Sequence, residues 1–271
     1  MPSPSPLAVV LALGLAGIAA WEAWAARHDA ASGPDDPDDA AWHAAADEVR
    51  QGFRPGDLVV FAPAWADPIG RRELGDLIPV ATAARMDAAR YGRIWELAIR
   101  GAHAPDVAGL APVASRDHGG VAVRRFERAP AIVVGDVLDR VASVRVASTS
   151  VPAAARPEVV LAEVGFAPHR CVQISPPAGA PVRLTFPALP LGRELVGYLG
   201  IADVFTRRDD RTPVRLDVEL AGRVIASADA GVDDGWVRFA AATPPGAADV
   251  TFVVRAVSAH RKLCFAAEAR Q

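Results

Sequence analysis

The sequence has 271 residues, of which 51% are hydrophobic and 23% charged, and this composition excludes a disordered chain. Its 22 glycines and 23 prolines follow no collagen-like period. The formal net charge of −3 gives no electrostatic reason to bind nucleic acid or an anionic membrane surface, so no nucleic-acid partner is expected.

The first 28 residues have the composition of a membrane-targeting segment. Leu7–Trp21 is an unbroken run of apolar residues and glycine, and Ala23–Ala26 extends it beyond Glu22 to about the 20 residues that a membrane span needs. Residues 1–28 are therefore predicted to form a signal anchor, that is, a transmembrane helix. A signal peptide cleaved near residues 23–25 is the alternative. Under either interpretation, the body of the protein is expected to be exported from the cytoplasm. The anchor would hold it at the inner membrane of a bacterial cell envelope.

The remaining chain divides by composition. Residues 29–41 form a short, acidic, proline-containing linker. Residues 42–150 alternate helical and strand patterns and are predicted to be a small α/β module. Residues 153–271 contain only strand patterns and are predicted to be an antiparallel β-sandwich. The expected fold class is thus α+β with two domains after an N-terminal membrane helix.

Within the α/β module, the apolar spacing predicts a helix that ends at Phe53. It is followed by a continuously apolar strand over residues 58–63, of the kind that is buried on both faces of a parallel sheet. Further elements are expected as helices over 67–78 and 106–114 and as strands over 93–99 and 120–126. Pro63-Ala64-Trp65 occupies the position where a glycine-rich phosphate loop would follow the first strand, which argues against nucleotide binding of that type.

Part of this module resembles a known family. The early Trp42, the sequence Pro-Gly-Asp-Leu-Val-Val, a later Arg-Ile-Trp strand and a Gly-Val-x-Val-x-x-Phe strand are similar to the extracytoplasmic tail of bacterial glycosyltransferases of the protein-mannosyltransferase and aminoarabinose-transferase superfamily. The resemblance covers residues 42–127. It implies an accessory module at the outer face of the membrane, without transferase chemistry, because the catalytic loops of that family lie among many membrane helices.

The C-terminal region contains nine short strand-like runs separated by turns, which predicts a two-sheet sandwich. In Val214–Leu220, for example, apolar and charged residues alternate strictly. The sequence around Gly197–Asp203, the Leu-Asp-Val-Glu-Leu-Ala-Gly turn and Asp233–Trp236 resembles jelly-roll modules of the galactose-binding-like type. The nine predicted strands are 158–164, 171–174, 182–186, 195–199, 214–220, 224–226, 236–240, 250–256 and 263–267.

The only two cysteines are Cys171 and Cys264, and they lie in the first core strand and in the last strand of this region. Terminal strands often pair in jelly rolls, so the resemblance implies a Cys171–Cys264 disulfide. An even cysteine count in an exported protein favours the same pairing. Two buried cysteines that never meet are the alternative. A zinc site is disfavoured, because no further cysteine or histidine stands at ligand spacing, and no metal ligand is assigned.

Charged and aromatic residues of the sandwich loops are the candidate ligand-binding residues. Tyr198 and Trp236 are expected to stack on a sugar ring, with arginines as planar hydrogen-bond donors, although Trp236 also suits a place in the core. The aspartates suggest calcium binding, but turn formation is the favoured explanation for them, and no cofactor is assigned. The predicted site consists of Tyr198, Asp203, Arg207, Arg208, Arg211, Asp233, Asp234 and Trp236.

No catalytic motif is present. A G-x-S-x-G nucleophile elbow does not occur, and no pair of carboxylates is identified by its spacing. The function predicted is non-catalytic recognition of carbohydrate or of a glycan-linked envelope partner by the sandwich loops. Two alternatives stay open: a scaffold for envelope glycosyltransfer that acts through protein contacts, and a hydrolase with an unrecognised site.

Overall fold

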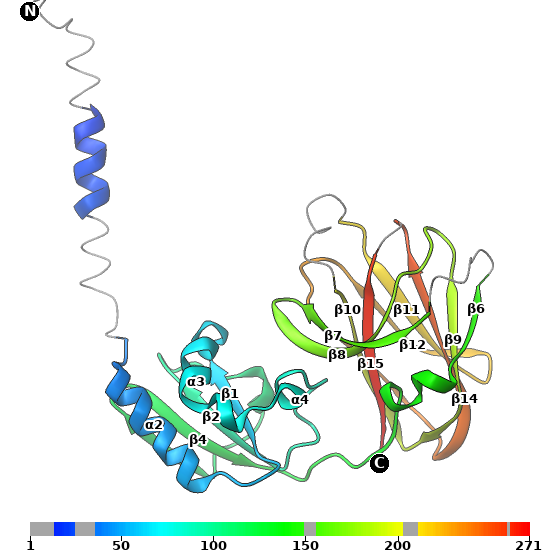
Figure 1. Cartoon of the computed structure of the whole chain (residues 1–271), viewed down its shortest axis with the longest axis horizontal. Coiled ribbons are helices and arrows are strands. Elements are labelled where there is room, and N and C mark those ends of the chain that lie inside the picture. The colour runs from blue at the N-terminus through cyan, green and yellow to red at the C-terminus, as the bar shows by residue number, and fades with distance from the viewer. Residues whose placement is uncertain (1–13, 25–35, 149–155, 203–210, 259–260) are drawn as a thin grey trace, which may run out of the picture.

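The computed structural model describes residues 14–24, 36–148, 156–202, 211–258 and 261–271 and consists mostly of β-sheet. Two units follow one another along the chain, a small α/β module and a larger β-sandwich (Figure 1). Residues 14–24 are helical. Among the residues described, no helix is both long and apolar enough to cross a membrane. Residues 1–13 and 25–28 of the expected anchor and residues 29–35 of the linker lie outside the described ranges.

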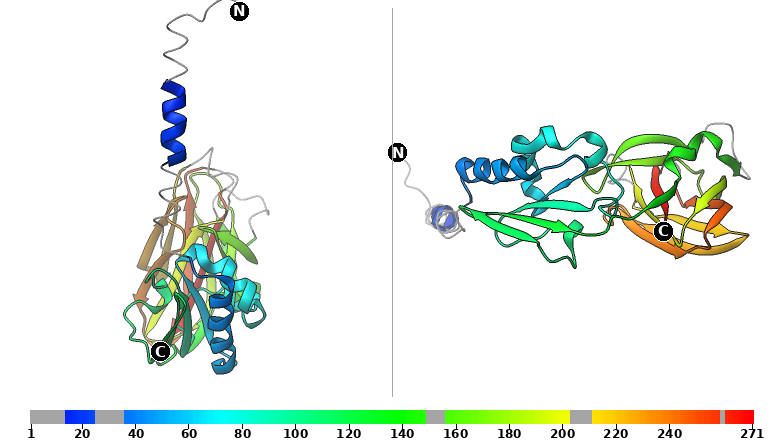
Figure 2. Two further views of the ribbon diagram at one scale, coloured as in Figure 1. Left: turned by 90° about the vertical axis from the view of Figure 1, so that its left-hand side faces the viewer. Right: turned by 90° about the horizontal axis from the view of Figure 1, so that it is seen from below.

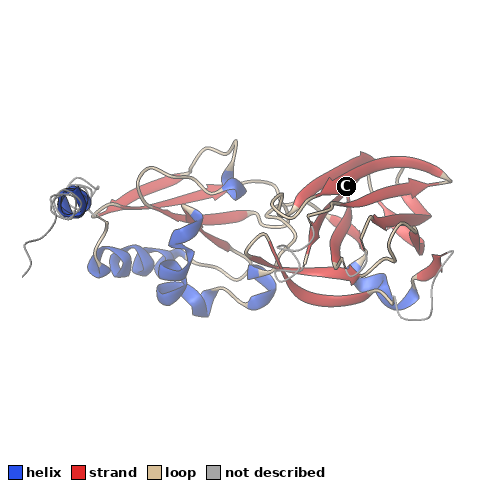
Figure 3. Cartoon of the chain, turned by 90° about the horizontal axis from the view of Figure 1, so that it is seen from above, coloured by secondary structure: helices blue, strands red, loops and turns tan. Residues whose placement is uncertain are grey.

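The α/β module is a four-stranded sheet of order β1-β2-β4-β3, with helices packed on one side of it (Figure 3). Strands β1 and β2 are parallel, and every residue of β1 is buried, as the continuously apolar run predicted. Helix α2 begins where the Asp38 carboxylate accepts a hydrogen bond from the Ala41 amide at 2.8 Å, and it buries Trp42 and Val49 against the sheet. The bounds are α2 (Asp39–Gly52), β1 (Leu58–Ala62), α3 (Asp67–Leu74), α4 (Val80–Ala83), β2 (Arg93–Ala98), β3 (Ala114–His118) and β4 (Val121–Glu127).

Several elements of this module differ from the expectation. Helix α3 ends at Leu74 instead of continuing to residue 78, and the short helix α4 was not expected. The helix predicted over 106–114 is only a 3-10 turn, Pro105–Val107, and Gly109 has a φ of 76° that a continuing helix does not allow. Strand β3 was not predicted. Its residues are almost all exposed, so the strand has no alternation of apolar and polar side chains to reveal it.

The β-sandwich has a six-stranded and a five-stranded sheet, and each of the nine predicted strands is present. The order β13-β10-β15-β8-β7, with β5 also paired to β15, makes the first sheet, and β12-β11-β14-β9-β6 makes the second. The bounds are β5 (Val133–Asp136), β6 (Arg145–Ser148), β7 (Glu158–Val164), β8 (Ala167–Ile174), β9 (Val182–Leu191), β10 (Glu194–Ile201), β11 (Val214–Leu220), β12 (Arg223–Ala230), β13 (Val237–Ala242), β14 (Gly246–Ala256) and β15 (Leu263–Arg270).

The core of the sandwich lies between its two sheets. Phe252 packs edge-on against Phe186, with ring centroids 5.5 Å apart, and lies 5.0 Å from the ring of Phe265 in the other sheet. Burial of each such side chain contributes about 1.5–3 kcal/mol. This packing holds the two sheets against each other and therefore positions the ends of their strands.

The sandwich begins earlier in the chain than its strand patterns indicated. Strands β5 and β6 lie within the residues 42–150 that were assigned to the α/β module, but β5 pairs with β15 and β6 pairs with β9. Both strands have only four residues and are largely not buried, so their sequences lack a distinct apolar face.

Candidate functional site

The candidate site occupies the loop end of the sandwich, defined by residues 165–166, 211–213 and 231–235, where β10 finishes at Ile201 and β11 begins at Val214. Arg211 and Asp233 form an ion pair here, so the structure brings together two residues that the sequence proposed. Asp234 accepts a hydrogen bond from the Gly231 amide at 2.7 Å, which is ordinary turn chemistry. Asp203, Arg207 and Arg208 lie outside the described residues.

The β7–β8 hairpin contributes an aromatic residue that sequence reasoning missed. Its two-residue turn is Gly165-Phe166, with φ values of 58° and 67°, and Val164 pairs with Ala167 on either side of it. Turns of this kind favour glycine and asparagine, because a Cβ crowds the backbone at positive φ. Phe166 is nevertheless present, and its residue is 83% exposed. The sequence does contain a sign of this turn, because the Gly-Phe dipeptide stands between two strand patterns.

The hairpin tip lies directly against the loop that contains the two aspartates. A Cβ atom added to Gly165 would lie 2.9 Å from the Cα of Gly235. That close approach places Phe166 beside the loop 231–236, with its charged residues Asp233 and Asp234. The loop end thus combines an exposed aromatic ring with carboxylate and guanidinium groups.

Tyr198 and Trp236 do not lie free on the surface. Their rings are stacked, with centroids 5.9 Å apart, and Trp236 also stacks on the His169 imidazole at 4.4 Å. The Trp236 Nε1 donates a hydrogen bond to the carbonyl of Met86 at 3.1 Å, and the Tyr198 hydroxyl lies 3.4 Å from a carboxylate oxygen of Asp87. Both side chains therefore contact the α/β module.

The α/β module lies beside the sandwich (Figure 2). Residues 84–91 of the module, here called the bridging segment, make the contact with these side chains. The Arg170 amide donates to the carbonyl of Ala84 at 2.9 Å. The Arg90 guanidinium donates to Glu268 at 2.7 Å and to Asp136 at 2.5 Å. Backbone and charged groups therefore bind the two units together, and the stacked aromatics of the sandwich are part of that interface.

Several titratable side chains at this interface have shifted pKa values, among them His169 and Glu268. Burial lowers the pKa of His169 to about 4, although its hydrogen bond to the Arg85 carbonyl acts in the opposite direction. Burial raises the pKa of Glu268, and the neighbouring Arg270 and Arg90 only partly offset that effect. These shifts follow from the contact between the two units and need no catalytic role to explain them.

The predicted disulfide is confirmed. Cys171 in β8 and Cys264 in β15 are bonded, with Cα atoms 5.6 Å apart, and they are fully buried beside Val164. The two strands are hydrogen-bonded neighbours, and Cys264 stands opposite Gln173 in the register. Among the described residues, no group of three or more histidines, cysteines or acidic side chains is arranged to hold a metal ion.

Comparison with known proteins gives a limited result. No protein-family profile matches the chain, and no curated protein matches it. The C-terminal resemblance extends to solved structures of carbohydrate-binding modules. Residues covering 58% of this chain superpose on 36% of a Clostridium perfringens ZmpB structure, which holds the CBM51-2 domain in complex with GlcNAc and INT domains, with 12% identity and a TM-score of 0.37.

Two further solved structures match this chain with similar sequence identity and TM-score. The tandem CBM51 modules of the family 98 glycoside hydrolase Sp3GH98 from Streptococcus pneumoniae match 57% of this chain and 56% of theirs, at 11% identity and a TM-score of 0.34. The CBM22-1 and GH10 modules of Clostridium thermocellum xylanase 10B with xylohexaose match 52% of this chain and 28% of theirs, at 15% identity and a TM-score of 0.33. With TM-scores below 0.5, these likenesses say nothing about the activity of this chain. The transferase-tail resemblance of residues 42–127 stays a prediction.

Proposed function

We propose that this protein is a non-catalytic glycan-recognition protein whose sandwich binds sugar at its loop end. The observation that supports this proposal is the exposure of the Phe166 ring at a backbone position with positive φ. An aromatic side chain at a positive φ costs stability, and 83% exposure forgoes the free energy of burying its ring. A residue with both costs is typical of a binding position, and a flat aromatic ring is a suitable platform for the apolar face of a pyranose.

The polar groups beside the ring support the same function. Sugar hydroxyls both donate and accept hydrogen bonds, and the loop end supplies planar N–H donors from Arg211 and acceptors from Asp233 and Asp234. Arg211 and Asp233 pair with each other, so a ligand would meet a donor and an acceptor side by side. Tyr198 and Trp236 would act behind this surface by holding the sandwich on the bridging segment.

The test is a glycan array with the full chain and the variant Phe166→Gly. Glycine adopts the positive φ of this turn without strain, so the variant is expected to fold with equal or greater stability and to lose at least ten-fold in glycan affinity. The matched control is Ala221→Gly. Ala221 has a φ of 51° in the β11–β12 turn, so this change relieves the same kind of strain in another hairpin.

The proposal fails if the folded wild-type chain binds no glycan, or if Phe166→Gly binds as well as the wild type does. Each array is run with and without calcium, because the aspartates of the loop end are oxygen donors that suit a hard cation. Binding that requires calcium would assign Asp233 and Asp234 to a metal site as well.

The cellular location proposed is the outer side of a bacterial inner membrane, with residues 1–28 as the anchor. The Cys171–Cys264 disulfide supports export, because such bonds persist in oxidising compartments. Fractionation of cells that express the full chain tests this location. Recovery of the protein in the soluble cytoplasmic fraction with both thiols reduced would refute it.

A further inference from the structure

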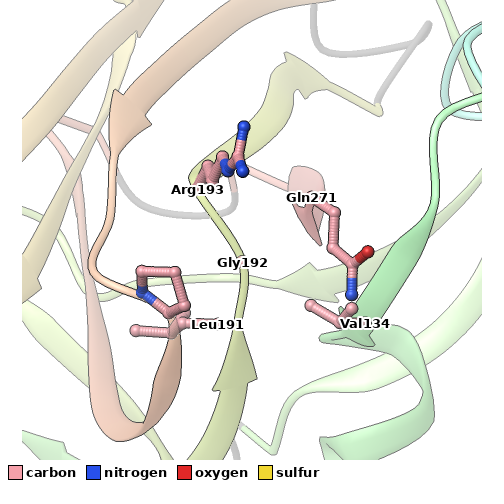
Figure 4. A pocket seen from close by; sticks show the side chains of 6 residues that line it. Val134, Leu191, Gly192, Arg193 and Gln271 are labelled. Atoms are coloured by element: carbon pink, nitrogen blue, oxygen red, sulfur yellow. The ribbon is translucent and has the colours of Figure 1, made fainter.

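A hollow lies at the opposite end of the sandwich from the proposed glycan site. It has a volume of about 420 Å³ and is formed where β9 turns into β10 and where β15 ends (Figure 4). The pairing of Glu194 with Arg270 and of Ile201 with Leu263 places it a full strand length from the loop end. Its lining consists of Val134, Leu191, Gly192, Arg193, Pro245 and Gln271.

The backbone that forms the hollow is fixed by close crossings and by hydrogen bonds. A Cβ atom at Gly192 would lie 2.0 Å from the carbonyl oxygen of Arg270, so only glycine permits this crossing. The Arg193 amide donates to the Arg270 carbonyl at 2.7 Å. Thr243 donates from its amide to the Arg193 carbonyl at 2.8 Å and from its hydroxyl to the Gly192 carbonyl at 2.9 Å. The carbonyl groups of Gly192, Arg193 and Arg270 thus already have hydrogen-bond donors, and the backbone around the hollow is preorganised.

The side chains that remain for a ligand are mainly donors. The Arg193 guanidinium and the Gln271 carboxamide form no hydrogen bond or ion pair with any side chain or backbone group in the described part of the chain. Together they offer seven N–H groups and one carbonyl oxygen. Val134, Leu191 and Pro245 supply apolar surface beside them. A ligand that satisfies this arrangement is rich in acceptors at one end and apolar at the other.

We propose that this hollow binds a small monocarboxylate with an apolar body, such as an aromatic or branched aliphatic acid. The guanidinium fork matches the two oxygens of a carboxylate, and the aliphatic side chains cover the apolar part. The half-buried Glu194 lines the adjoining hollow together with Ala240–Ala242, and its negative charge disfavours a second carboxylate on the ligand. The site is independent of the glycan site, because no residue is shared between them.

The test is a titration of the full chain with benzoate, followed by calorimetry or by NMR chemical shifts, with benzamide as the uncharged analogue. Benzoate is expected to bind saturably and benzamide at least ten-fold more weakly. The variant Arg193→Gln is expected to lose at least ten-fold in benzoate affinity and to keep its fold, because the side chain is exposed and forms no ion pair with the residues that the structure describes. The matched control Arg223→Gln removes an exposed arginine at the β11–β12 hairpin and is expected to bind benzoate normally.

Three results would overturn the proposal: equal binding of benzoate and benzamide, unchanged binding by Arg193→Gln, or no saturable benzoate binding at millimolar concentrations. Phe166→Gly is expected to bind benzoate as the wild type does. The glycan proposal can therefore fail without affecting the carboxylate proposal, and the carboxylate proposal can fail without affecting the glycan proposal.

Discussion

Arg270 donates hydrogen bonds to both carboxylate oxygens of Asp87, each at 2.9 Å, and thereby joins the last strand of the sandwich to the bridging segment of the α/β module. The Arg270 side chain is 5% exposed and also donates to Glu268 at 3.0 Å. A guanidinium that is held by two carboxylates in a site shielded from water has a defined geometry. The two units therefore form one body, and the loop end of the sandwich faces a fixed direction relative to the α/β module.

Asp87→Ala is expected to destabilise the protein by about 2 to 4 kcal/mol, because it removes one partner of a largely buried arginine. Urea denaturation monitored by tryptophan fluorescence measures this change. Proteolysis of the chain between β4 and β5 should accelerate, since the two units would separate more often. Asp76→Ala, which breaks an exposed pair with Arg50, is the control and should have a much smaller effect. Equal effects of both variants would show that the interface does not depend on Asp87.

The depressed pKa of His169 predicts a loss of stability in acid. The folded protein keeps the ring neutral down to about pH 4, whereas the unfolded chain takes up a proton near pH 6.5. Protons therefore favour unfolding, and the free energy of unfolding falls as the pH drops from about 6.5 to 4. The expected loss is about 2 kcal/mol, which is less than the full pKa difference implies, because solvent partly screens the charge on the ring. Below pH 4 this contribution is fully lost.

His169→Phe keeps an aromatic ring against Trp236 but does not titrate, so its stability should depend less on pH over the same range. Urea midpoints at pH 7.5 and 4.5 give the comparison for the two proteins. Glu268 has its raised pKa in both and cancels in the difference. The same loss of stability in both proteins would contradict the prediction.

The sequence predicts sandwich strands such as β11 well because apolar residues alternate with charged ones along them. The central strand β15 is buried along its whole length and has no solvated face. The interface with the bridging segment is not predictable in this way. The segment binds through the carbonyl groups of Ala84 and Met86, and backbone groups leave no pattern of residue types. The aromatic side chains of this interface are a separate case. The sequence favours a sugar platform for Trp236 and Tyr198, because an aromatic residue at an intramolecular interface has the same sequence signature as one that binds a ligand.

Removal of the disulfide is expected to lower the thermal stability of the sandwich. Cys171 and Cys264 are 93 residues apart, and loop-closure entropy for such a separation corresponds to roughly 4 kcal/mol. For a chain of this size, that change lowers the Tm by about 8 to 16 °C. Thermal melts of Cys171→Ser/Cys264→Ser against the oxidised wild type measure the difference, and the wild type treated with a reductant should resemble the variant. A Tm within two degrees or so of the oxidised protein would refute this expectation.

Trp236→Ala is expected to weaken the contact between the two units without direct damage to the proposed glycan surface. The change removes the stacking on His169 and Tyr198 and the hydrogen bond to the Met86 carbonyl, at a cost of about 2 to 3 kcal/mol for a partly buried tryptophan. Urea denaturation measures the loss, and a glycan titration of the folded variant measures its binding. If Phe166 provides the sugar platform, the variant should bind within about three-fold of the wild type, equivalent to about 0.7 kcal/mol. A complete loss of binding from a folded Trp236→Ala protein would instead assign the platform to Trp236 and remove Phe166 from that role.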